Sequence, residues 1–294
     1  MSDAASLGAA AAFGASATWA YASARYALAA REVSPIRVNL VRMLVAGPLF
    51  LALGLATGSL GVGLTPRHLG WLALSTMCSY AFADSLFFAA AKRIGVSSAL
   101  AIASTYPLWA ALKGTLVDGE SFGLGRAAGT LLCVGGVAAV IKLGQAAAAV
   151  AGEVKDPWGV PFSLITSVLW AGNTIAIKTG AVGLSLFTVN GVRYSLAILV
   201  LGALVLAGRA PGAKRPAAGW LPLLPAIASD CVVGAMMFIY GLTHTDLAVG
   251  ATLSSLAPLL SLPFAVWLGA EKLSPAKLAA VATTVAGIAL LATS

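Results

Sequence analysis

Two runs of sequence, Val38-Asn39-Leu40-Val41-Arg42 and Val189-Asn190-Gly191-Val192-Arg193, decide the fold, because the second repeats the first 151 positions later. Each run lies inside a long apolar stretch. Asparagine and arginine are scarce in such stretches, since polar and charged side chains are costly at membrane depth. Their recurrence at the same spacing therefore indicates an internal repeat.

The repeat extends over both halves of the chain at this offset and without a gap. Matches of alanine or leucine carry little weight in so apolar a sequence. Matches of tryptophan, proline and glutamate carry more weight, because these residue types are scarcer in membrane spans. The informative pairs are Trp19 with Trp170, Ser34 with Ser185, Ser104 with Ser255, Pro107 with Pro258, Glu120 with Glu271, and Gly136 with Gly287.

The composition indicates that lipid is the solvent for most of this chain. Of the 294 residues, 60% are apolar and 10% are charged, whereas a soluble domain has about 25% charged residues. The net charge of +8 does not indicate nucleic-acid binding, because the cations are spread singly among apolar spans and form no basic stripe. We therefore expect the lipid bilayer, and no nucleic acid, as a partner.

Long apolar runs predict an all-α membrane protein with ten transmembrane helices. A helix needs roughly 20 apolar residues to cross a bilayer, and proline, glycine and charged residues separate the runs. The predicted helices are 5–29, 36–57, 68–92, 96–117, 123–143, 158–180, 185–208, 219–243, 248–268 and 275–293. The polar stretch midway along the chain predicts a first five-helix repeat at 1–143, a linker at 144–157 and a second repeat at 158–294.

Five helices per repeat is an odd number, so the second repeat must be inverted relative to the first. Loops after odd-numbered helices carry twelve of the 18 cations, and the other loops carry three. The twelve are Arg25, Arg31, Arg37, Lys92, Arg93, Lys142, Lys155, Arg209, Lys214, Arg215, Lys272 and Lys277, and the three are Arg67, Arg126 and Lys178. Because cytoplasmic loops carry excess Lys and Arg, this bias predicts that both termini lie outside.

Three motifs of the first half, each with a counterpart in the second, resemble the drug/metabolite transporter superfamily and its EamA-type members. The first-half motifs are Asn39-Leu40-Val41-Arg42, Ser104-Thr105-Tyr106-Pro107-Leu108 and Gly119-Glu120. Their counterparts are Asn190 to Arg193, Leu256-Ala257-Pro258-Leu259 and Ala270-Glu271. The resemblance covers nearly the whole chain.

The resemblance implies two inverted repeats that form a basket of helices around a central cavity. It also implies export of amino acids, drugs or other metabolites, and an amino-acid exporter is one member type that the chain can resemble. The expected location is a bacterial inner (plasma) membrane. Members of the family tend to have basic, cytoplasmic termini, and the charge bias of this chain is the opposite. We expect a monomer.

Asp84 is the candidate for an ion-coupling group, because it lies near the middle of the third predicted helix. A carboxylate there costs roughly 3 kcal/mol to insert, so it should face the bundle interior. Three roles are open: proton coupling, an anchor for a substrate amine, or a structural pair with Lys113. Lys113 could instead face an anionic substrate group. Asp230 is a weaker candidate, because the start of its helix can reach the interface.

Arg42 and Arg193 lie about two turns into their helices, and we expect them to snorkel or to pair at the membrane interface. Aromatic side chains could form an amphipathic pocket with Asn173 for a flat or cationic solute, although aromatics in membrane helices often only pack or face lipid. The predicted substrate-cavity residues are Trp19, Asn39, Tyr80, Asp84, Tyr106, Trp109, Lys113, Trp170 and Asn173.

Pro107 and Pro258 fall near the middle of the fourth and ninth predicted helices. Proline removes a backbone hydrogen bond and kinks a helix. The two residues are therefore predicted hinges beside the substrate site, with a static packing kink as the alternative. Glu120 and Glu271 stand before the next helix, where capping, a loop ion pair or a gate ion pair would each suit a carboxylate.

Signatures of catalysis, nucleotide binding and metal binding are missing from the sequence. Its three cysteines lie in apolar spans without metal-ligand spacing and indicate no disulfide framework. We expect no cofactor, no metal and no enzymatic activity. The sequence therefore favours a secondary transporter for small solutes that uses no ATP. The alternatives are a non-transporting membrane subunit, such as a lipid-flipping partner, and an intramembrane enzyme.

Overall fold

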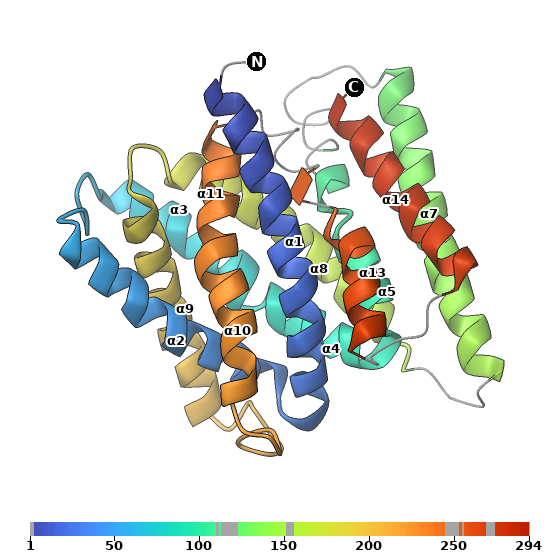
Figure 1. Cartoon of the computed structure of the whole chain (residues 1–294), viewed down its shortest axis with the longest axis horizontal. Helices are drawn as coiled ribbons and strands as arrows, with labels where there is room; N and C mark the ends of the chain where they lie inside the picture. The colour runs from blue at the N-terminus through green and yellow to red at the C-terminus, as the bar shows by residue number, and fades with distance from the viewer. Residues whose placement is uncertain are drawn as a thin grey trace.

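The computed structural model describes residues 3–109, 112, 123–150, 156–244, 253–254, 256–268 and 274–293, and it is built almost entirely of helices (Figure 1). In the first half the elements are α1 (Asp3–Glu32), α2 (Pro35–Ala56), α3 (Pro66–Thr76), η1 (Met77–Ala81), α4 (Ala83–Ile94), α5 (Val96–Ala103) and α7 (Leu124–Val150). In the second half they are α8 (Gly159–Gly180), α9 (Leu186–Leu206), η2 (Leu221–Leu223), α10 (Leu224–Ile227), η3 (Ala228–Gly234), α11 (Ala235–His244), α13 (Ala257–Trp267) and α14 (Pro275–Thr293).

Each of the ten predicted spans contains one or more of these helices, which confirms the all-α membrane fold. Within the described residues, five helical stretches are long and apolar enough to cross a membrane, judged by length and composition alone. Large apolar side chains such as Leu55, Leu131, Leu199 and Leu206 are exposed on the outer surface, as a lipid solvent requires. The start of α1 and the end of α14 lie at the same end of the bundle, as an even number of spans demands (Figure 1).

Local sequence explains where several spans begin. Proline occupies the first turn of α2 and of α3, where its missing N–H costs no hydrogen bond. Thr65 caps α3 through its hydroxyl, which accepts from the backbone N–H of His68 at 3.3 Å. Ser185 caps α9 in the same way, accepting from the N–H of Thr188 at 3.0 Å.

Contacts between the halves obey the symmetry that the sequence repeat predicts. Arg37 Nε donates to the carbonyl of Ala210 at 3.2 Å. The repeat-equivalent contact joins Thr188, which corresponds to Arg37, to the carbonyl of Ser59, which corresponds to Ala210, at 2.7 Å. When each half supplies the same surface to the other, the halves are related by a twofold operation, and the odd helix count makes that relation an inversion.

Two helix pairs join each helix to its own repeat counterpart. α2 packs against α9, and α7 packs against α14 (Figure 1). In the second pair, Gly136 lies against Thr284, and its counterpart Gly287 lies against Cys133, with no room for a Cβ at either position. The two glycines therefore let α7 and α14 approach closely across the twofold axis.

Three spans are less regular than predicted. π-helices η1 and η3 interrupt the third and eighth spans at equivalent positions, because Met77 and Ala228, their first residues, stand 151 positions apart. In the fourth span α5 ends at Ala103, and Ser104 and Thr105 form a turn before helix resumes at Tyr106. π-helical segments often occur at functional sites. All three irregular segments contribute residues to one cavity inside the bundle.

Some predictions fall outside the described residues, namely those on Lys113, Glu120 and Glu271. The fifth span is longer than predicted, because α7 continues to Val150 and so enters the segment predicted as a linker.

Candidate functional site

A cavity of about 130 Å³ lies between the two repeats. Both halves supply its walls, from α1 and the third span on one side to α8, α9 and the eighth span on the other. Six of the nine predicted cavity residues line it: Trp19, Tyr80, Asp84, Tyr106, Trp170 and Asn173. The cavity also contains side chains that we did not predict there, chiefly Arg42, Ser79, Arg193, Tyr194 and Asp230.

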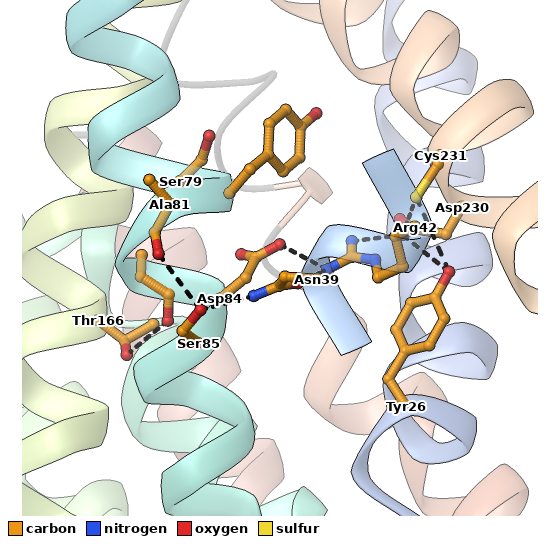
Figure 2. Close-up of polar contacts among 12 residues, drawn as sticks. Tyr26, Asn39, Arg42, Ser79, Ala81, Asp84, Ser85, Thr166, Asp230 and Cys231 are labelled. Carbon is orange, nitrogen blue, oxygen red and sulfur yellow. Dashed lines mark hydrogen bonds and ion pairs between the residues drawn. The ribbon is translucent and has the colours of Figure 1, made fainter. Parts of the chain in front are cut away.

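Arg42 is the centre of a buried ionic cluster (Figure 2). Its Nη1 lies 2.8 Å from Asp84 Oδ2, and its Nη2 lies 2.8 Å from Asp230 Oδ2. Nη1 also donates to the Asn39 side-chain oxygen. Two carboxylates thus share one guanidinium, which gives the cluster a formal charge of −1.

The cluster corrects the expectation that Arg42 and Arg193 lie at the membrane interface. They are the two largest fully buried side chains of the described residues, each 1% exposed. Asp230 does not reach the interface either, because it is held on Arg42. Asp84 faces the interior as expected, but its partner within the described residues is Arg42.

Neighbouring side chains fix this cluster in place. Asn39 does not line the cavity; it accepts from Arg42 and donates to Ser85 Oγ at 2.9 Å, which orients the arginine from behind. Trp170 Nε1 donates to the second oxygen of Asp84 at 3.2 Å. The guanidinium also lies 4.4 Å from the ring centroid of Tyr26, a cation–π contact.

Arg193 forms a second polar centre with different partners. Its Nη2 donates to Ser79 Oγ at 3.1 Å and to Asn173 Oδ1 at 3.0 Å. Its Nη1 donates to the Tyr80 hydroxyl at 3.2 Å, and the guanidinium lies 4.6 Å from the Tyr80 ring centroid. All these partners are neutral, so this centre keeps a formal charge of +1.

Aromatic rings form the wall beside the Arg42 cluster. Trp19 and Trp170, which are repeat counterparts, meet edge to face with their centroids 5.9 Å apart. Tyr106 meets Trp170 in the same manner at 6.4 Å. Trp109 packs behind these rings and donates to Ser167 at 2.9 Å, and it is not among the cavity-lining residues.

The two prolines stand next to helix starts. Pro258 occupies the first turn of α13, and Pro107 follows Tyr106, where helix resumes after the Ser104–Thr105 turn. Both prolines are buried. Each therefore begins a helical segment, where the missing N–H is harmless, and the discontinuity places Ser104 and Tyr106 at the cavity.

Sequence reasoning missed the burial of the arginines and of Asp230, although a signal existed. The Asn-x-x-Arg match marks Arg42 and Arg193 as equivalent, and Asp230 is the repeat counterpart of Ser79. When two such repeats pack around a twofold axis, Arg42 should meet Asp230 and Arg193 should meet Ser79. Among the described residues, no group of three or more His, Cys, Asp or Glu side chains could hold a metal ion. The arrangement is suited to binding a polar solute.

The chain matches the EamA-like transporter family twice, at residues 6–142 and 157–293. An uncharacterized transporter of Archaeoglobus fulgidus is 29% identical over 183 residues, which cover 62% of this chain and 63% of that protein. The match thus spans less than two thirds of that relative.

One solved structure, titled only "Crystal structure of protein", matches with a TM-score of 0.67 at 22% identity. The match covers 95% of this chain and 94% of the chain in that structure. That likeness shows the fold. The family match covers nearly all of both repeats and confirms the resemblance seen in the sequence: the chain is a multi-pass membrane protein that belongs to the EamA-like transporter family.

Proposed function

We propose that this transporter exports small organic solutes, such as amino acids, metabolites or drugs, by alternating access and without ATP. The observation that carries the proposal is the cavity between the inverted repeats, which is lined by buried Arg42, Arg193 and Asp84 and by the partly buried Asp230. Ionisable groups at membrane depth are costly, and they mark solute and ion pathways in transporters.

The contacts that close the cavity cross between the repeats. Arg42 reaches Asp230 from one repeat to the other, and Arg193 reaches Ser79 in the opposite direction. Rocking of one repeat against the other would break and re-form these contacts. The turn at Ser104–Thr105 and the turn at Leu256 suit hinges at Pro107 and Pro258, because proline removes a backbone hydrogen bond and an interrupted helix bends at small cost.

Asp84 suits the role of an ion-coupling group. One of its oxygens holds Arg42, and the other accepts from Trp170. Protonation would remove the ion pair with Arg42 and loosen the cluster. A cationic group of the solute would compete for the same carboxylate, so that solute and proton could exchange at one site.

Further parts of the proposal concern the setting of the chain. External termini are proposed from the charge bias of the loops, and a bacterial inner membrane is proposed from the family resemblance. A monomer is part of the proposal, because the two repeats of one chain both supply residues to the walls of the cavity.

Solute flux in proteoliposomes tests the proposal. The purified chain is reconstituted, and uptake of a broad panel of radiolabelled amino acids, organic acids and drugs is measured at several pH values. We expect saturable flux of at least one solute, and we expect its pH dependence to disappear in Asp84→Asn. Trp158→Phe serves as the control, because Trp158 is exposed and does not line the cavity.

Absence of flux across the whole panel would contradict transport of small solutes. Movement of fluorescent lipids between leaflets, measured in the same vesicles, would then favour the lipid-flipping alternative. An unchanged pH dependence in Asp84→Asn would exclude this residue as the coupling group.

A further inference from the structure

The two repeats break their symmetry at the charges of the cavity. Arg42 has two acidic partners, Asp84 and Asp230. The positions that would supply the equivalent partners to Arg193 are 235 and 79, and they hold Ala235 and Ser79. One arginine is therefore paired twice, and its counterpart has no acidic partner among the described residues.

The surroundings of Arg193 leave hydrogen-bonding capacity unused. Its Nε has no hydrogen-bond partner in the described part of the chain. The amide of Asn190, one turn earlier, is fully buried, and neither of its polar atoms is hydrogen-bonded to any residue that the structure describes. The counterpart amide, Asn39, is bonded to both Arg42 and Ser85.

A buried guanidinium without a counterion is unfavourable, because the protein does not replace the hydration that the charge has lost. An external anion can reach the Arg193 guanidinium through the cavity, because Arg193 lines it together with Ser79, Tyr80 and Asn173. The hydroxyl of Ser79 donates to the carbonyl of Ser75 at 2.8 Å, and that of Tyr80 donates to the Tyr194 hydroxyl at 3.5 Å. Either hydroxyl can rotate to donate instead to an anion beside the guanidinium.

We propose that Arg193 is the binding site for a carboxylate of the transported solute, with the hydroxyls of Ser79 and Tyr80 as further donors. The inference rests on the proposed function and names the substrate class of the same cavity. A guanidinium binds the planar carboxylate through paired hydrogen bonds. A phosphate dianion is disfavoured, because one cation faces it and the Arg42 cluster contributes a net negative charge to the same cavity.

Binding measurements on the full chain test the proposal without requiring transport. The chain is placed in lipid nanodiscs, and the affinities of phenylacetate, phenylacetamide and phenyl phosphate are measured by the change in tryptophan fluorescence. Competition between pairs of these ligands then gives their relative affinities. The phenyl group is chosen because Trp19, Trp170 and Tyr106 line the cavity. We expect phenylacetate to bind more tightly than either the amide or the phosphate.

Two variants then separate binding from folding. Loss of a charge-assisted contact in Arg193→Gln should weaken phenylacetate binding about tenfold to a hundredfold, and the affinity for phenylacetamide should change little. Ser79→Asp introduces the carboxylate that the equivalent position 230 carries. It should pair with Arg193, raise the thermal midpoint and abolish phenylacetate binding, which a misfolded variant would not do.

Equal affinity of the unmodified chain for phenylacetate and phenylacetamide would overturn the proposal, as would unchanged phenylacetate binding in Ser79→Asp or Arg193→Gln. Binding and flux fail separately. Selective carboxylate binding without flux would refute transport and leave the Arg193 site standing. Flux that persists in Arg193→Gln with the same preference for carboxylates would refute the site alone.

Discussion

Arg42 is the cation on which both acidic side chains of the cavity depend, so Arg42→Met should be among the most destabilising single substitutions in the described chain. Methionine fills similar space and leaves Asp84 and Asp230 without their counterion. Their side chains are only 6% and 14% exposed, so water replaces little of the lost interaction.

The size of the effect follows from this burial. Removing one partner of a buried ion pair costs about 3–5 kcal/mol, because the remaining charge is uncompensated. Here one substitution strands two carboxylates, each 2.8 Å from a guanidinium nitrogen. We therefore expect the upper part of that range. Adding Asp84→Asn and Asp230→Asn to the same chain should restore most of the loss, since no buried charge then remains in the cluster.

Equilibrium unfolding of the purified chain in mixed micelles, with increasing fractions of a denaturing detergent, measures the free energy of unfolding. Arg93→Met is the matched control, because the ion pair of Arg93 with Asp156 is partly exposed and should contribute far less. A loss below about 1 kcal/mol in Arg42→Met, the range of exposed pairs, would refute the reasoning. So would a triple variant no more stable than the single one.

Gly136→Ala should lower the unfolding free energy by about 1–3 kcal/mol, because its Cβ would meet the Thr284 backbone nitrogen at 2.5 Å. Gly135→Ala, with nothing within 4 Å, is its control in the same unfolding assay, and equal effects would contradict close packing of α7 on α14. Asn190→Leu should be neutral or stabilising, since it removes a buried amide that has no hydrogen-bond partner among the described residues. Asn39→Leu should cost about 1–3 kcal/mol, since it breaks a hydrogen bond to a charged group. A lower thermal midpoint for Asn190→Leu than for Asn39→Leu would contradict both predictions.

The fold was predictable because two kinds of signal agree. Apolar runs of membrane length set the number of helices, and the paired Asn-x-x-Arg motifs set the offset between the halves. The symmetric contacts of Arg37 and Thr188 follow once that offset is known. Such signals are local or repeated, so a single sequence contains them.

The interior of the site was less predictable. Whether Arg42 faces lipid or its neighbours depends on the rotation of α2 about its own axis, and an apolar helix in lipid has little amphipathic pattern to reveal this rotation. The π-helices are a second example, because the run Met77–Ala81 is compatible with an ordinary α-helix. Both π-helices pack against helices of the other repeat, and such contacts cannot be read from the local sequence. Asp84 was recognised because a carboxylate at that depth has few alternatives.

The pairing of α2 with α9 and of α7 with α14 has an ancestral meaning. A half-length chain made of one repeat would bury these helices against a second copy of itself, as an isologous antiparallel homodimer. In such a dimer every residue occurs twice, so its cavity could hold only two identical poles. A single polypeptide is free of that constraint, so Asp84 and Asp230 can pair with Arg42 while Ser79 and Ala235 stand at the equivalent positions near Arg193.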